Sequence, residues 1–151
     1  MPSMSISHSV PLNVSIDDAW AKLQSEQTWA GIGPISSVSN PKHSEDGMLE
    51  AFEWDANVGG KVYHGTAKTI EATAPTRFVL DMDTSEIVGH VTTVLTETGD
   101  TCDVTVSMDL TTKGMLSAMF FPAIKGALNS GFPQQVEDLA ATFSLEPGTG
   151  S

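Results

Sequence analysis

Histidine and carboxylate side chains are the residues whose types could carry chemistry here, so their spacing is considered first. The four histidines are His8, His43, His64 and His90, and none stands at metal-ligand spacing from another. Glu86 precedes His90 by four residues. On a strand that spacing separates them by about 13 Å, at a rise of roughly 3.3 Å per residue. The sequence therefore predicts no metal site.

Two pairs of aspartates raise the question of acid–base catalysis. Asp81 and Asp83 share one face of a predicted strand, as do Asp103 and Asp109. The apolar residues of these strands point the other way, so we expect the four carboxylates to be solvated, whereas catalysis needs a carboxyl group in a dry pocket. There is no nucleophile elbow and no phosphate-binding loop, and the Gly31–Gly33 segment is only a fragment of a dinucleotide motif. No cofactor is predicted.

Tyr63, His64 and His90 are better candidates, because a Tyr or His on a strand can hydrogen-bond a ligand held above a sheet. Neighbours on a strand face opposite sides, so Tyr63 and His64 cannot both point inward. We favour Tyr63, since Gly65 and Ala67 on its side leave space above the sheet. Tyr63, His64 and His90 are the catalytic candidates if the protein is an enzyme.

The elements that must position these residues begin with a strictly alternating strand. In Thr101–Thr112 apolar residues occupy every second position from Cys102 to Leu110, which predicts one dry and one wet face. After Gly114 apolar residues recur at nearly every fourth position as far as Phe143, which is typical of a long helix. A half-wet antiparallel sheet with a helix over its dry face is an α+β layer design.

The rest of the chain is predicted as further strands and short helices. Ser5–Val14 is a predicted strand, Ser15 is the predicted N-cap of a short helix, and Thr28–Pro34 has room for another turn. Lys61–Ala72 and Glu86–Thr96 carry apolar residues on both faces, so the sequence does not assign their inner side. The other predicted strands are Ile35–His43, Met48–Ala56 and Arg77–Thr84.

Composition bounds the class of protein. The 151 residues suit one domain, expected over residues 1–145 with a disordered tail at 146–151. Seven Lys plus Arg against 19 Asp plus Glu give a formal net charge of -12, which argues against nucleic acid and membrane-surface partners. No stretch is apolar for long enough to span a membrane. The single cysteine and the absence of a secretory pattern lead us to expect a cytoplasmic location.

Three segments carry a family resemblance: Ile16–Leu23, Gly60–Gly65 and Ala74–Phe78. In this order of elements they resemble the START/Bet v 1-like superfamily, the helix-grip fold of polyketide cyclases and lipid-transfer domains. The run Thr111–Leu116 also resembles the carbon monoxide dehydrogenase branch of that superfamily. The resemblance covers Ser5 to about Leu145. It implies a seven-stranded curved antiparallel sheet (β-α-α-β6-α) around a long C-terminal helix, with an apolar cavity between them.

The resemblance also implies a function class. Members of the superfamily bind lipids, steroids, polyketides, quinones or plant hormones, some are cyclases or aromatases, and others assist protein assembly, so the fold does not settle the function. We expect this chain to bind a lipid, polyketide, quinone or similar hydrophobic molecule in the cavity. A polyketide cyclase or aromatase and an assembly factor acting by protein contact are the alternatives. Whether the chain forms a homodimer or binds a protein client is left open.

The expected ligand contacts are apolar and aromatic side chains, including methionines that can repack around varied ligands. They are Trp29, Phe52, Trp54, Tyr63, Leu80, Met82, Val106, Met108, Met115, Met119, Phe120, Ile124 and Leu128.

Overall fold

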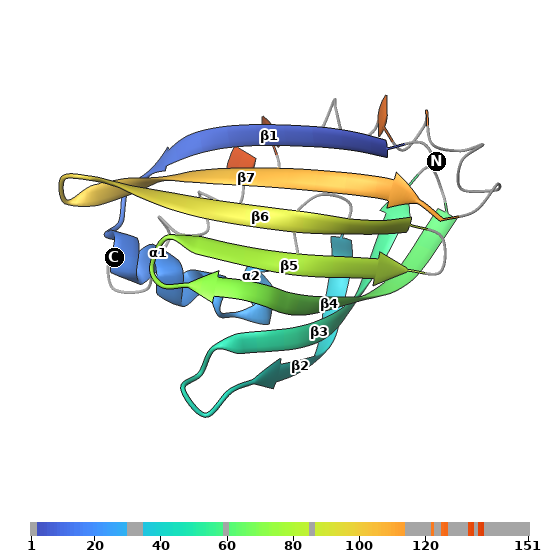
Figure 1. Cartoon of the computed structure of the whole chain (residues 1–151), viewed down its shortest axis with the longest axis horizontal. Coiled ribbons are helices and arrows are strands. Elements are labelled where there is room, and N and C mark those ends of the chain that lie inside the picture. Colours follow the sequence, from blue (N-terminus) through green and yellow to red (C-terminus); the bar gives the residue numbers. More distant parts are fainter. Residues whose placement is uncertain are drawn as a thin grey trace.

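The computed structural model describes residues 3–29, 35–58, 61–84 and 87–113, together with seven positions between 122 and 137. In this part of the chain two short helices accompany seven strands (Figure 1). The helices are α1 (Ile16–Leu23) and α2 (Glu26–Trp29). The strands are β1 (Ser3–Leu12), β2 (Ile35–His43), β3 (Leu49–Val58), β4 (Lys61–Thr73), β5 (Arg77–Thr84), β6 (Ile87–Thr98) and β7 (Thr101–Thr112). No helix among these residues is long and apolar enough to cross a membrane.

All seven strands form one antiparallel sheet in the order β1-β7-β6-β5-β4-β3-β2. Each strand from β2 to β7 pairs with the next one along the chain, and β1 returns to pair with β7. The sheet curves, most visibly where β2, β3 and β4 turn away from the other strands (Figure 1). The predicted curved, seven-stranded antiparallel sheet is confirmed.

The strand bounds follow the turn signals of the sequence. β2, β5 and β7 begin and end where the sequence predicts, whereas β1 lies two residues earlier than the predicted Ser5–Val14. The reason lies in its partner, because Leu12 of β1 already pairs with Cys102, next to the first residue of β7. Beyond Leu12 there is no further β7 residue to bind, and the chain leaves the sheet toward α1.

The first helix begins as its cap residue predicts. The Ser15 hydroxyl accepts a hydrogen bond from the Asp18 amide at 3.2 Å, and Asp17 and Asp18 stand in the first turn, where carboxylates suit the helix dipole. The helix buries Ala19, Trp20 and Leu23, which share one face.

Aromatic contacts attach both helices to one end of the sheet. The Trp20 ring meets the Phe78 ring edge-on at 5.9 Å, and the Trp29 ring stacks on it at 6.0 Å. The Trp29 indole also donates a hydrogen bond to the Leu23 carbonyl at 3.1 Å, which ties α2 to the end of α1. These contacts close the sheet at the end where Phe78 lies.

Burial assigns the inner face of every strand, including the two that the sequence left open. We call the buried side of the sheet the inner face and the opposite side the outer face. In β4 and β6 alternate residues are buried and their neighbours are not. The buried ones are Tyr63, Gly65 and Ala67 in β4, and Gly89, Val91, Thr93 and Leu95 in β6.

The predicted long C-terminal helix lies largely outside the described residues, as does the predicted tail at 146–151. Val136 is among the positions that are described there, and it is fully buried in the same apolar cluster as Leu80 and Val106. At least this residue of the C-terminal segment therefore belongs to the core that forms on the inner face.

Gly89 marks a close approach between β6 and β7. An added Cβ there would lie 2.2 Å from the Asp109 carbonyl oxygen and 2.6 Å from Leu110 Cδ2. Because that oxygen belongs to the backbone of the next strand, it cannot move aside. We expect Gly89→Ala to lower the free energy of unfolding by about 1–3 kcal/mol, measured by urea denaturation.

Gly126→Ala is the matched control, since an added Cβ at Gly126 meets no atom within 4 Å. This variant should unfold at the same urea concentration as the wild type or slightly higher. Equal midpoints for Gly89→Ala and the wild type would contradict the close packing of these two strands.

Candidate functional site

The inner face of the sheet is an apolar surface built by alternate residues of neighbouring strands. One row of directly paired residues runs from Ile6 through Met108 and Val91 to Leu80, across β1, β7, β6 and β5. Because the pairing register is continuous, every row on this side is made of residues that the two-residue period places together. The result is an extended surface suited to an apolar ligand.

Coverage of the inner face changes from one end to the other. At the end that the helices close, Phe78 and Val106 have no exposed surface. Toward the opposite end Met82 keeps 6% exposure, and Leu110 and Trp54 are only half-buried. The surface is therefore sealed beside α1 and α2 and incompletely covered at the far end.

The structure brings most of the described ligand contacts together on this face. Trp29 is the exception, since it lies in α2 and packs against Phe78. On the inner face lie Phe52, Trp54, Tyr63, Leu80, Met82, Val106 and Met108. Outside the described residues lie Met115, Met119, Phe120, Ile124 and Leu128.

Two of the three catalytic candidates lie on the outer face, where they cannot reach the interior. The two-residue period that turns Tyr63 and Val91 inward turns His64 and His90 outward. His90 Nε2 lies 3.5 Å from the Asp81 carboxylate and His64 contacts carboxylates of β3. The prediction that His64 or His90 acts in the cavity is therefore wrong, whereas Tyr63 is buried on the inner face.

The space predicted above Gly65 is occupied. A Cβ on Gly65 would lie 2.5 Å from Trp54 Cζ2, so the indole ring rests directly on the glycine. Trp54 is the residue paired with Gly65 across β3 and β4, and a large side chain leans over a partner that has none. The inference from Gly65 alone missed this cross-strand contact.

His8 is an inner-face residue that the sequence analysis did not select. Its Nε2 atom is buried and lies 3.5 Å from a carboxylate oxygen of Glu137 in the C-terminal segment. The signal was present in the sequence, because His8 alternates with Ile6, Val10 and Leu12 along the first strand. A histidine in an apolar alternation should have been placed on the dry face.

Several buried polar atoms of the described residues have no hydrogen-bond partner. They are His8 Nε2, Gln24 Nε2, Trp54 Nε1 and Thr93 Oγ1. Gln24 is otherwise engaged, because its side-chain oxygen accepts the Leu49 amide at 2.9 Å. His8, Trp54 and Thr93 lie on the inner face and supply its polar positions.

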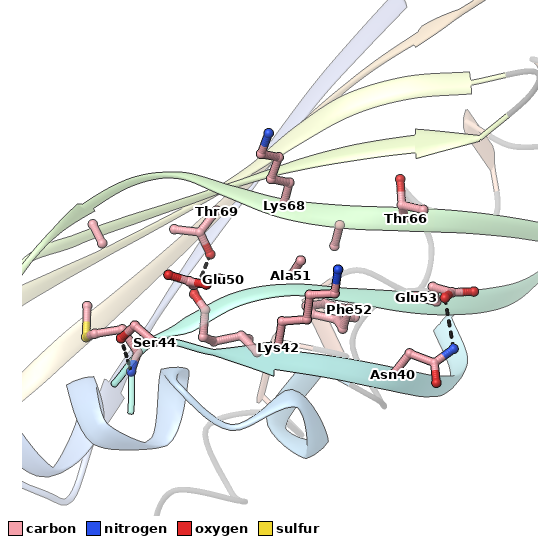
Figure 2. A pocket seen from close by; sticks show the side chains of 14 residues that line it. Asn40, Lys42, Ser44, Glu50, Ala51, Phe52, Glu53, Thr66, Lys68 and Thr69 are labelled. Atoms are coloured by element: carbon pink, nitrogen blue, oxygen red, sulfur yellow. Dashed lines mark hydrogen bonds between the residues drawn. The ribbon is translucent and has the colours of Figure 1, made fainter. Parts of the chain in front are cut away.

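The structure also shows a polar groove of about 860 Å³ on the outer face of β2, β3 and β4 (Figure 2). Lys42 and Lys68 stand on either side of Ala51 in one cross-strand row, and Asn40 donates a hydrogen bond to Glu53 at 2.8 Å. These side chains point away from the inner face, so this groove is distinct from the hollow that the sequence predicts between sheet and helix.

Metal and thiol chemistry find no support among the described residues. No group of three His, Cys, Asp or Glu side chains there could hold a metal ion. Cys102 is buried on the inner face, and burial raises the pKa of its thiol. A raised pKa disfavours the thiolate, so Cys102 acts as an apolar core residue.

No family model matches the chain, and no curated protein matches its sequence. Solved structures do match. The Zhui aromatase/cyclase from a Streptomyces species superposes with a TM-score of 0.76 at 9% identity, over 95% of each chain. A START superfamily protein from Mycobacterium smegmatis gives 0.61 at 13% identity, over 86% of this chain and 97% of that one. The chain has the START/Bet v 1-like fold.

A third relative with this fold has two domains. The di-domain ARO/CYC StfQ from the steffimycin biosynthetic pathway matches with a TM-score of 0.68 at 13% identity. The match covers 93% of this chain and 50% of that one. Identities this low establish the START/Bet v 1-like fold and leave the chemistry to the residues of the site.

The outer-face His64 supplies a testable electrostatic contact. Its Nδ1 lies 2.6 Å from Asp55 Oδ1 and its Nε2 lies 3.2 Å from Glu53 Oε1. The hydrogen bond with Asp55, with a smaller contribution from Glu53, raises the pKa of His64 above 6.5. We expect Asp55→Asn to lower the pKa of His64 toward its ordinary value, measured by NMR titration of the imidazole protons.

The sign of the effect on stability follows from that shift. Because the folded-state pKa of His64 is raised, the contact stabilises the fold below about pH 6.5, and the contribution is lost as pH rises through the folded-state pKa. Asp81→Asn, beside His90, is the control and should leave the His64 titration unchanged. The same His64 pKa in wild type and Asp55→Asn would show that the contact is absent in solution.

Proposed function

We propose that this protein binds a hydrophobic small molecule against the inner face of its sheet. The supporting observation is the incomplete cover of that face, which is apolar along its length, sealed near Phe78 and half-buried near Leu110 and Trp54. Removing about 400 Å² of apolar ligand surface from water at about 25 cal/mol per Å² gives roughly 10 kcal/mol before association costs. A gain of that size is enough for useful affinity.

The ligand class follows from the same surface. The ligand is a lipid, a polyketide, a quinone or a molecule of similar apolar character, held between the sheet and the C-terminal segment. Val136 already packs into the core cluster from that segment. The relatives of known fold are named as aromatase/cyclases and a START protein, which supports an interior binding site without choosing the ligand.

Met108 allows the interior site to be tested from the sheet side. It lies in the row between Ile6 and Val91 and keeps 6% exposure. We expect Met108→Trp to fill the space over the sheet and to weaken binding of the neutral dye Nile red by about tenfold or more, which corresponds to about 1.4 kcal/mol. Fluorescence titration measures the affinity, and circular dichroism checks that the variant is folded.

Ser107→Trp is the matched control, because Ser107 neighbours Met108 on the outer face and hydrogen-bonds Ser7 at 3.0 Å. The same bulk on that side should leave Nile red affinity within about twofold, since the inner face is untouched. If the two variants bind the dye equally well, or if the wild type does not bind it, the interior site is refuted.

One observation favours an enzyme as the second candidate. His8 Nε2 faces the Glu137 carboxylate at 3.5 Å on the inner face, and a histidine beside a carboxylate is a suitable general base. In a ring closure of the kind an aromatase/cyclase performs, a base removes a proton from the carbon beside a carbonyl. A carbon–carbon bond then forms to a second carbonyl carbon and water leaves, so no oxidant is needed.

His8→Gln separates this candidate from simple binding. With a linear triketone as substrate, we expect the variant to close the ring about a hundredfold more slowly than the wild type, because the base is lost. Absorbance of the aromatic product measures the rate, and Nile red affinity should stay unchanged. His64→Gln, on the exposed outer face, is the control. Equal rates in His8→Gln and the wild type, or no wild-type turnover, would remove the enzyme candidate and leave the binding proposal in place.

A further inference from the structure

Trp54 carries a hydrogen-bond donor on the inner face that no described residue satisfies. Its Nε1 atom is buried and has no partner, although the ring as a whole is half-buried. An indole N–H can only donate, so the missing partner must be an acceptor. A buried donor without an acceptor costs free energy, and each such group in a folded protein requires an explanation.

The geometry places this donor at the floor of the inner face. Trp54 Cζ2 and Cε2 lie 2.5 and 2.7 Å from the position of an added Cβ on Gly65, and Cε2 is the carbon bonded to Nε1. The N–H edge of the ring therefore lies low over β4. Tyr63 is the diagonal cross-strand neighbour of Trp54, which makes this end of the inner face aromatic.

The nearest hydroxyl in the same row is already engaged. Thr84 pairs with Gly65 on the side away from Trp54. Its Oγ1 donates to the Ile87 carbonyl at 3.0 Å and accepts the Ile87 amide at 2.8 Å. These local bonds close the turn from β5 toward β6, so the Thr84 hydroxyl is committed to that turn.

Charge narrows the class of acceptor. The described residues of the inner face include no lysine or arginine. The whole chain carries a formal net charge of -12, which opposes the approach of an anion. A carboxylate or phosphate oxygen would enter this site without a cation to pair with, whereas a neutral carbonyl oxygen accepts a hydrogen bond at little desolvation cost.

We propose that Trp54 Nε1 donates a hydrogen bond to the carbonyl oxygen of a neutral apolar ligand, such as a ketone, ester or quinone. This inference rests on the proposed interior binding site and specifies its polar contact. The ligand enters at the half-buried end, where Trp54 and Leu110 lie, and its apolar body extends along the inner face toward Phe78.

Two probes of one skeleton test the contact. Fluorenone and fluorene have the same three fused rings and differ in a carbonyl group, so their affinity ratio isolates the hydrogen bond from the apolar contacts. We expect the fluorenone-to-fluorene affinity ratio to fall by about five- to tenfold in Trp54→Phe, which keeps an aromatic ring and removes the donor. Isothermal titration of wild type and variant with each probe gives the ratio.

Thr93→Val is the matched control, because Thr93 Oγ1 is the other inner-face hydroxyl without a partner among the described residues. It lies in the row of Phe78, about 20 Å along the strands from the row of Trp54, at roughly 3.3 Å per residue. This variant should keep the wild-type ratio. A ratio that falls in Thr93→Val and not in Trp54→Phe would overturn the assignment to Trp54.

The indole proton gives a second readout that needs only the wild-type fold. In ¹H–¹⁵N spectra the Trp54 indole signal should move downfield with fluorenone and stay near its place with fluorene, while the Trp20 and Trp29 signals change little. Binding of both probes with no downfield shift overturns the hydrogen bond and leaves the interior site standing. If neither probe nor Nile red binds, the interior site itself fails, and this inference with it.

Discussion

The register of the antiparallel sheet is the constraint on which the rest of this structure depends. Side chains alternate with a period of two, so a slip of one residue in any pair would turn the whole apolar set of a strand toward water. Burial on the inner face holds the register, and polar contacts on the outer face agree with it. Ser7 meets Ser107 and Ser9 meets Thr105 across β1 and β7. The inner-face rows, and with them any ligand site, follow from that single alignment.

Within the register, pairs of large and small residues shape the inner face. Gly65 accepts the Trp54 ring, and Gly89 lies under Leu110. In both pairs the glycine lets a neighbouring side chain lie down on the sheet, which lowers the floor and keeps the large residue from filling the space above. At the other end three aromatic rings around Phe78 do the opposite and close the sheet. One surface thus has a sealed end and an incompletely covered end.

Sequence reasoning reached the strands and the fold because turn residues and alternation are local signals. The bounds of β2, β5 and β7 were predictable from their flanking turns, and Ser15 from its place before a helical pattern. The inner face of β4 was not, since Val62 and Ile70 are apolar but point outward at 63% and 53% exposure. Contacts between strands, such as Trp54 over Gly65, depend on pairing and are invisible in one strand.

The return of β1 to β7 has a consequence for how the chain folds. Strands β2 to β7 join their neighbours through short connections, but β1 must wait for the last strand to be made before it finds its partner. On the ribosome the first strand therefore emerges long before its binding edge exists. Such distant pairing raises contact order and slows folding, and the waiting strand is the segment that a chaperone would most usefully shield during synthesis.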